Sequence, residues 1–266
     1  NLVPKGMCLK LHLLAGECVV SLDKKEYEKY NKFEKKSFFK LSTEQNKILK
    51  EVLKNSKDFR VHLIQGTTGS GKTIVYFKAV EEKLNKGLQA LILLPEIGLT
   101  SEFEKKFKEF FGFNAAVWHS GITPKRKKII WSGLATGKIK VVIGARSSLF
   151  LPFKKLGILI VDEEHDQSYK QDEGVIYNAR DMAIARANFE SIPINLVTAV
   201  PSIETYANIK NNKYSFSRLI NRYKEASLPT HEIIDLKKNK LSKNNWISLE
   251  TVNQVKKHLK FGNQIL

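Results

Sequence analysis

The sequence is poor in cysteine and has no long apolar run. Its two cysteines, Cys8 and Cys18, do not make a disulfide framework, and no further cysteine pair or His-x-His pattern completes a zinc site with them. No apolar run approaches the roughly 18 residues that a membrane-spanning helix needs, and no basic-then-apolar signal sequence opens the chain. We therefore predict reduced thiols, a cytoplasmic protein and no membrane partner.

Acidic residues are scarce relative to basic ones. Lys and Arg number 45 against 27 Asp and Glu, which gives a net charge of +18. This excess favours a polyanionic partner such as nucleic acid. Most of it is lysine spread along the whole chain and often flanked by glutamate, as on solvated helix surfaces, so charge alone leaves both interpretations open.

A starting methionine is absent as well, and the last residues, Gln264, Ile265 and Leu266, resemble the opening of a strand. We expect both ends to be cuts through a longer protein. What is present is ample apolar content: 42% of the 266 residues are hydrophobic, enough for the core of one large domain or two small ones.

One stretch carries a complete phosphate-loop pattern, G-x-x-x-x-G-K-S/T. It follows the apolar run 61–64 and precedes residues 74–84, whose apolar positions have helical spacing. Its glycines let backbone N–H groups point at phosphate oxygens, the lysine places a charge against the β and γ phosphates, and the threonine hydroxyl is a ligand for Mg²⁺. A chance glycine-rich turn would not bring the strand, the helix and the Lys-Thr pair together. The predicted ATP-binding residues are Gly66, Thr67, Thr68, Gly69, Ser70, Gly71, Lys72 and Thr73.

A second chemical site follows the apolar run 158–161, which is typical of a buried parallel strand. Asp162 is predicted to hold the magnesium through its water shell, and Glu163 to orient and deprotonate the attacking water. His165 is placed to relay the nucleotide state to neighbouring loops. An acidic turn after a core strand is the alternative, but its position about 90 residues after Lys72 favours the hydrolytic interpretation.

Gln45 has two interpretations that do not exclude each other. Ser42 and Gln45 have the spacing of a helix capping box, with Ser42 as the N-cap. Gln45 could also read the adenine edge of a nucleotide, because helicases often carry a glutamine at this distance before the phosphate loop.

Strand and helix patterns alternate along the chain. Apolar runs at 88–94, 115–119, 139–143 and 192–197 predict strands, and 125–136 and 179–189 predict helices. This order predicts an α/β fold with a mostly parallel sheet and helices on both faces. The turns after Ile64, Leu94, Ile143 and Val161 should then share one edge. Phe103, Phe107, Phe110 and Phe111 form one helix face, which we assign to the core.

The segment between Asp166 and Asp181 mixes aromatic and basic residues beside the hydrolytic carboxylates. This composition suits contact with single-stranded DNA by stacking and charge, and it suits an ordinary surface loop equally well. The residues concerned are Tyr169, Lys170, Tyr177 and Arg180.

Taken together, these motifs resemble the PriA family of replication-restart helicases in superfamily 2, from about residue 41 to residue 266. The phosphate loop alone indicates an NTPase; the Pro-Glu-Ile-Gly-Leu-Thr, Asp-Glu-Glu-His-Asp and Ser-Tyr-Lys-Gln runs are far more specific. The matching segments, in order, are 41–45, 66–73, 94–100, 119–121, 144–150, 162–171, 179–181 and 198–202.

The resemblance implies a RecA-like P-loop NTPase lobe of an ATP-dependent 3′-to-5′ DNA helicase with a DEAH-type motif. It implies ATP and Mg²⁺ as cofactors, and single-stranded and forked DNA as ligands. It also implies single-stranded-DNA-binding protein and primosome proteins as partners in restarting stalled forks. Arg146 and Ser147 would lie on the strand-tracking side, and 169–180 would couple DNA contact to hydrolysis.

Two residues depart from the family pattern. Val175 stands near a position where the family usually has an aromatic residue, which leaves stacking to Tyr177. Val200 replaces the hydroxyl residue of the usual Ser-Ala-Thr-Pro motif, which should weaken the coupling of hydrolysis to movement. The family's zinc segment and second motor lobe are expected after Leu266, and its fork-recognition domain before the motor.

We therefore expect an N-terminal extension at 1–40, a first helicase lobe at 41–225 and a connection to a second lobe at 226–266. The lobe alone would bind ATP and magnesium without unwinding DNA. Two other functions stay open: a translocase subunit of a restriction or remodelling complex, which would not predict the Tyr169-Lys170-Gln171 run, and a non-enzymatic nucleotide-binding docking module.

Overall fold

The computed structural model describes residues 27, 30, 39–54, 58–95, 98–172, 174–221, 232–238, 241 and 245–265. The chain divides into two compact units, Asn1–Glu225 and Ala226–Leu266. The predicted N-terminal extension lies almost entirely outside the described residues. In the second unit, helix α9 spans Leu249–Lys260, is capped by Ser248, and buries none of its side chains. No helix in the described part of the chain is long and apolar enough to cross a membrane.

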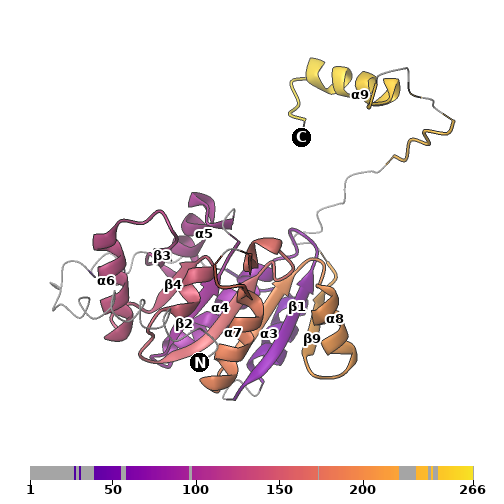
Figure 1. The fold of residues 1–266 in the computed structure, drawn as a ribbon. Coiled ribbons are helices and arrows are strands. Elements are labelled where there is room, and N and C mark those ends of the chain that lie inside the picture. The colour runs from indigo at the N-terminus through magenta and orange to yellow at the C-terminus, as the bar shows by residue number, and fades with distance from the viewer. Residues whose placement is uncertain are drawn as a thin grey trace. The chain divides into compact units, whose positions relative to one another are not determined.

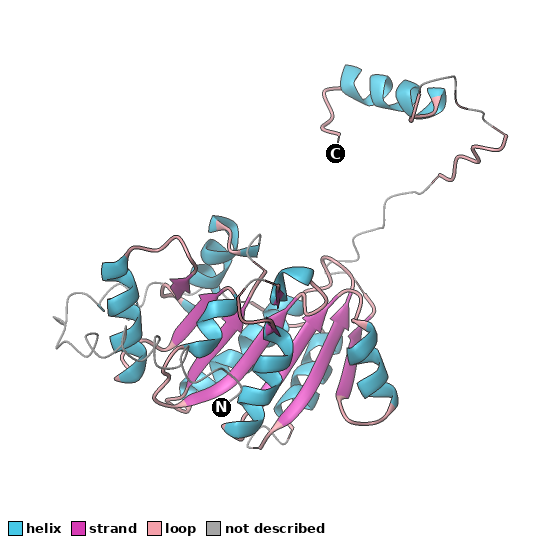
Figure 2. Cartoon of the chain, viewed as in Figure 1, coloured by secondary structure: helices cyan, strands magenta, loops and turns pink. Residues whose placement is uncertain are grey.

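The first unit is built on a seven-stranded sheet in the order β3-β4-β2-β5-β8-β1-β9 (Figures 1 and 2). Each neighbouring pair is parallel, which confirms the predicted sheet. The strands are β1 Arg60–Gly66, β2 Gln89–Leu93, β3 Ala116–Trp118, β4 Val141–Gly144, β5 Leu156–Asp162, β8 Pro193–Thr198 and β9 Ser215–Leu219. A short antiparallel pair, β6 Lys170–Gln171 and β7 Tyr177–Asn178, forms in the segment predicted as a loop.

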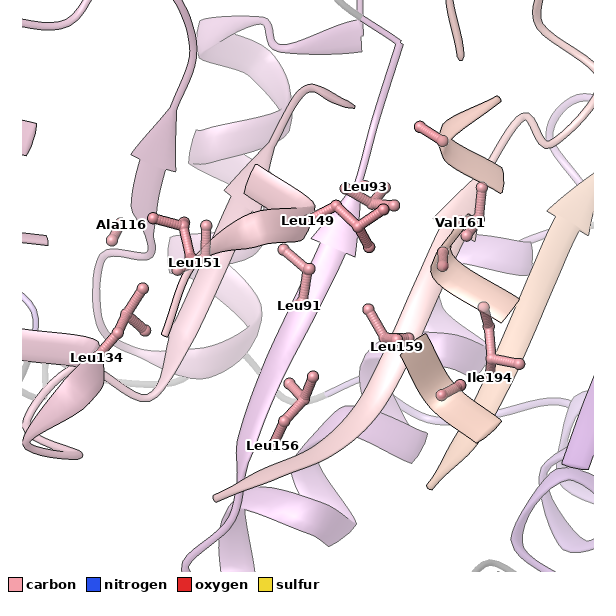
Figure 3. Packing of buried hydrophobic residues seen from close by; sticks show 14 of the residues in the cluster. Leu91, Leu93, Ala116, Leu134, Leu149, Leu151, Leu156, Leu159, Val161 and Ile194 are labelled. Atoms are coloured by element: carbon pink, nitrogen blue, oxygen red, sulfur yellow. The ribbon is translucent and has the colours of Figure 1, made fainter. Parts of the chain in front are cut away.

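Helices cover both faces of the sheet, as predicted. Strand side chains alternate between faces, so Leu91 and Leu159 join one apolar cluster, shown in Figure 3, while Ile92 and Ile160 join the other. Helices α6 and α7 pack in the first cluster and α3, α4 and α5 in the second. The helices are α3 Thr43–Leu53, α4 Lys72–Asn85, α5 Ser101–Phe111, α6 Pro124–Ala135, α7 Ala179–Phe189 and α8 Ile203–Lys210, with 3₁₀ turns η2 Arg146–Phe150 and η3 Gln167–Tyr169.

Local sequence explains how two of these helices form. At α3 the capping box is confirmed: Ser42 Oγ accepts from Gln45 N at 3.2 Å, and Gln45 Oε1 accepts from Ser42 N at 3.0 Å. In α5 the predicted aromatic face is buried except at Phe103, which is partly buried, and the rings of Phe107 and Phe111 stack at 4.3 Å and pack around Phe77 of α4. This aromatic cluster is core, as predicted, and it fixes α5 against α4.

The edge strand β9 was not predicted from the sequence. Its five residues mix polar and apolar side chains, and its two serines hydrogen-bond to a buried histidine on β1. His62 Nδ1 lies 2.8 Å from Ser215 Oγ, and Nε2 lies 2.9 Å from Ser217 Oγ. The pKa of His62 is lowered to about 4, chiefly by burial and also by the charge of nearby Arg60, while Glu51 partly opposes the shift.

His62 should make the stability of the chain depend on pH between about 6.5 and 4. In this range His62 is protonated in the unfolded state but stays neutral in the folded state. The free energy of unfolding therefore rises with pH and falls as acid is added. The folded and unfolded pKa values differ by enough to lower the free energy of unfolding by up to about 3 kcal/mol across the window. Urea unfolding at pH 7 and pH 4.5 measures the difference.

His62→Gln is the control, because its amide can meet both serines but does not titrate. Both proteins share every other acid-sensitive group, so the change in stability between the two pH values should be smaller in the variant. An equal loss of stability in the two proteins would rule out this effect of His62.

Candidate nucleotide-binding site

The predicted ATP-binding and catalytic residues lie at one edge of the sheet. Because the strands run parallel, the turns after β1, β2, β4 and β5 leave from the same edge, as predicted. A cavity of about 480 Å³ opens there, and the phosphate loop and the turn after β5 both line it. The lining residues are Thr68, Gly69, Gly71, Lys72, Thr73 and Ile74 of the loop and α4, Asp162 and Glu163 after β5, and Phe39, Phe77, Lys106, Glu109 and Phe110.

The phosphate loop adopts the curl that its glycines predict. Gly69 and Gly71 have φ angles of 81° and 85°, a left-handed conformation that other residues rarely adopt. Ser70 N donates to Thr67 O at 3.1 Å and closes the turn. A side chain at Gly71 would also collide with the Gln45 amide. Gly71 is the N-cap of α4, and no side-chain hydrogen bond caps this end of the helix, which suits the binding of an anion.

Lys72 is buried beside the loop, with 8% of its surface exposed. Its Nζ donates to Gly66 O at 2.7 Å and to Thr67 O at 3.3 Å. Both acceptors are neutral carbonyls, so neither balances the charge of the ammonium. A buried cation with this surrounding fits an anionic ligand such as a phosphate group.

Asp162 lies at the end of β5 with both carboxylate oxygens held. Oδ2 accepts from the Tyr76 hydroxyl at 2.9 Å, and Oδ1 accepts from Glu163 N at 3.0 Å. Burial raises the pKa of Asp162 to about 6, and the bond from Tyr76 and the charge of Lys72 oppose this rise. Burial and the neighbouring carboxylate raise the pKa of Tyr76 well above its usual value, so the phenol stays a neutral donor.

Glu163 and His165 occupy the turn that follows. Glu163 has a φ angle of 47°, unusual for a residue with a side chain, and such strain often marks functional turns. Its Oε2 lies 3.7 Å from His165 Nδ1, and the same nitrogen lies 2.6 Å from Thr198 Oγ1. His165 therefore joins the turn after β5 to Thr198 at the end of β8.

The residues present fit a magnesium nucleotide. The curled loop and Lys72 suit phosphates, and the oxygens of Thr73 and Asp162 are of the kind that Mg²⁺ prefers. Within the described ranges, no three acidic, histidine or cysteine side chains come together as a metal site of their own. Mg²⁺ bound with a nucleotide is usually held by one or two protein groups together with the phosphates.

Gln45 is 2% exposed, and its amide is engaged at both ends. Its Oε1 closes the capping box, and its Nε2 donates to Ser70 O in the phosphate loop at 3.3 Å. The residue therefore braces the loop against α3. A contact with adenine stays a prediction.

Two of the residues predicted to bind DNA lie in the core, which corrects the prediction. Tyr169 is 1% exposed, and its hydroxyl donates to Asp162 O at 2.6 Å and to Leu93 O at 3.1 Å. Arg180 is 6% exposed and donates to Glu164 Oε2 at 3.2 Å. Neither side chain is placed to stack on or contact a nucleic acid in this structure, because the ring and the guanidinium are buried and hydrogen-bonded within the protein.

The other four predicted DNA residues are at least partly exposed near the same edge. Arg146 Nη1 donates to Lys170 O at 2.6 Å, and Ser147 Oγ accepts from Trp118 Nε1 at 3.1 Å. The ring of Tyr177 packs edge-on against Phe150 at 5.6 Å, and Lys170 is exposed. Their role in binding DNA stays a prediction.

Sequence reasoning did not assign two important residues. Tyr76 bonds to Asp162, and its position one turn after Thr73 on the phosphate-loop helix was the available signal. Glu164 is 2% exposed and accepts from Ser202 N at 2.8 Å, Ser202 Oγ at 3.0 Å and Thr205 Oγ1 at 3.0 Å, besides Arg180. The two neighbouring glutamates therefore have different roles: Glu163 lines the cavity, and Glu164 fastens the turn to α7 and α8.

Several curated proteins are similar to this chain in sequence. The replication restart protein PriA of Rickettsia conorii is 51% identical over 204 residues, which are 77% of this chain and 32% of that protein. The PriA proteins of Haemophilus influenzae and Bacillus subtilis are 41% identical over 208 residues and 36% identical over 211 residues, covering 78% and 79% of this chain and 28% and 26% of theirs.

The chain thus spans about a third or less of the length of these curated relatives. The DEAD/DEAH box helicase family matches residues 42–209, a stretch that contains the phosphate loop, the acidic turn after β5 and the segment that joins them. The chain belongs to the DEAD/DEAH box helicase family.

Proposed function

We propose that this chain is the ATP-binding motor lobe of a PriA-type 3′-to-5′ DNA helicase that acts in the restart of stalled replication forks. The observation that carries the proposal is that Lys72 and the acidic pair Asp162 and Glu163, about 90 residues apart in sequence, line one cavity. Identity of 51% to a PriA protein supports the choice of this helicase type.

Each residue has a definite task in this function. The loop N–H groups and Lys72 bind the phosphates, and Thr73 and Asp162 hold the magnesium. Bound Mg·ATP supplies the phosphoanhydride bond whose hydrolysis drives movement. Glu163 orients and deprotonates the attacking water, and His165 passes the state of the site to the loop after β8.

The DNA ligand is single-stranded or forked, and the contacts come from Arg146, Ser147, Lys170 and Tyr177. The net charge of +18 supports a polyanionic ligand, and the partly exposed ring of Tyr177 offers a stacking surface. In the complete protein, zinc would belong to the segment after Leu266. Single-stranded-DNA-binding protein and primosome proteins would be the partners, in the cytoplasm. Residues 226–266 would connect this lobe to the second motor lobe.

ATP hydrolysis by the complete protein, measured without DNA, with single-stranded DNA and with forked DNA, tests the proposal. We expect stimulation of about tenfold or more, because closing of the motor on DNA completes the catalytic site. Forked DNA should stimulate at least as strongly as the single strand. A docking module would show no stimulation, and a translocase of duplex DNA would respond to an unbranched duplex instead; either result would overturn the proposal.

A further inference from the structure

Tyr76 contacts one of the two residues predicted to hold magnesium. It sits on α4, one turn after Thr73, the other of the two, and none of its surface is exposed. Its hydroxyl donates to Asp162 Oδ2 at 2.9 Å, across 86 residues of sequence. One phenol therefore connects the phosphate-loop helix to the carboxylate at the end of β5.

The surroundings of Tyr76 hold the phenol in place. Its ring meets the Phe77 ring edge-on at 5.1 Å, and α4 packs it into the apolar cluster beneath the cavity. A buried hydroxyl is costly without a partner, so the hydrogen bond to Asp162 is the reason that a tyrosine can occupy this position. A phenylalanine would suit the apolar surroundings as well but could not make this contact.

We propose that Tyr76 is a positioning residue for magnesium, whose hydroxyl holds the Asp162 carboxylate in the orientation that a divalent cation needs. The inference rests on the proposed function, in which Thr73 and Asp162 hold Mg²⁺. Glu163 N restrains only Oδ1 of the Asp162 carboxylate. Without the phenol, the carboxylate can turn about its last torsion, which has broad preferences.

Tyr169 provides a matched control. It too is a buried tyrosine whose hydroxyl reaches Asp162, but it donates to the backbone carbonyl of that residue at 2.6 Å rather than to the carboxylate. Tyr169→Phe therefore removes the same atom, at a similar depth and from the same neighbour, while the side chain of Asp162 keeps both of its contacts.

The test is the magnesium dependence of nucleotide binding. Binding of ATP carrying a fluorophore on its ribose is titrated with Mg²⁺, and again in EDTA, for the unmodified protein, Tyr76→Phe and Tyr169→Phe. Loss of a group that orients a metal ligand commonly lowers metal affinity by about 10-fold to 100-fold. We expect Tyr76→Phe to need about tenfold more Mg²⁺ for half-maximal binding, with unchanged binding in EDTA, and Tyr169→Phe to stay within about twofold of the unmodified protein.

Three outcomes would overturn the inference. If Tyr76→Phe keeps the original magnesium dependence, or weakens binding equally with Mg²⁺ and in EDTA, the residue has only a structural role. If Tyr169→Phe shifts the magnesium dependence as much, the effect comes from general loosening around Asp162. In each of these cases the unmodified protein still binds Mg·ATP, so the proposed function survives; an unmodified protein that binds no nucleotide would overturn both.

Discussion

Lys72→Ala is expected to abolish DNA-stimulated ATP hydrolysis in the complete protein, lowering the rate about 100-fold or more. The ammonium of Lys72 lies within the loop, bonded to Gly66 O and Thr67 O, and no acid shares these contacts. Removing such a preorganised charge from a phosphoryl-transfer site commonly costs about 100-fold to 1,000-fold in rate. Nucleotide binding should fall as well, because the lysine meets the phosphates in the ground state. Phosphate release and ATP affinity measure the two effects.

Lys78→Ala is the control for this experiment. Lys78 is on the same helix, but its ammonium pairs with Glu81 at 2.8 Å on the helix surface and does not line the cavity. Its removal takes the same charge from α4 and should leave hydrolysis nearly unchanged. Near-normal turnover by Lys72→Ala would contradict the role assigned to the loop.

Glu163→Gln should separate binding from chemistry. Glutamine keeps the size of the side chain but cannot accept the proton of the attacking water, and loss of a general base commonly costs about 100-fold to 10,000-fold. The Glu163 side chain is 42% exposed beside the cavity, so the substitution leaves no buried group without a partner. We expect the variant to bind ATP as tightly as the unmodified protein and to hydrolyse it too slowly for DNA to stimulate.

The neighbouring acid gives the matched comparison. Glu164 is buried and paired with Arg180 at 3.2 Å, so Glu164→Gln should lower the unfolding temperature by breaking a buried ion pair. The molecules that remain folded should still hydrolyse ATP. If Glu163→Gln kept its turnover while Glu164→Gln lost it, the two acids would have been assigned the wrong way round.

Much of the fold could be predicted because short stretches of sequence determine the individual strands and helices. The apolar run 158–161 lies inside β5, and the pattern at 179–189 coincides with α7. Strand β9 was missed because its five residues, three of them polar, form no apolar run. Its identity comes from pairing with β1, about 150 residues earlier in the chain.

The DNA-binding predictions for Tyr169 and Arg180 were wrong for a similar reason: contacts with distant parts of the chain decide where these side chains lie. Tyr169 and Arg180 lie in a segment whose composition suits contact with DNA, but their exposed fractions are 1% and 6%. A tyrosine and an arginine can serve a surface or a buried hydrogen-bond network equally well, and composition does not distinguish between them. The buried carboxylate of Glu164 decides the matter for Arg180, and the carbonyls at the ends of β2 and β5 decide it for Tyr169.

The sequence by itself determined the phosphate loop, the capping box at Ser42 and Gln45, the parallel strands and the edge at which they deliver their polar turns. These features depend on backbone preferences and periodicity within a few residues. Only the tertiary structure decided that Tyr76 would bond to Asp162, and that Glu164 would fasten its turn to α7 and α8. Such partners come from segments far apart in the chain, and the order of strands in the folded sheet sets which of them meet.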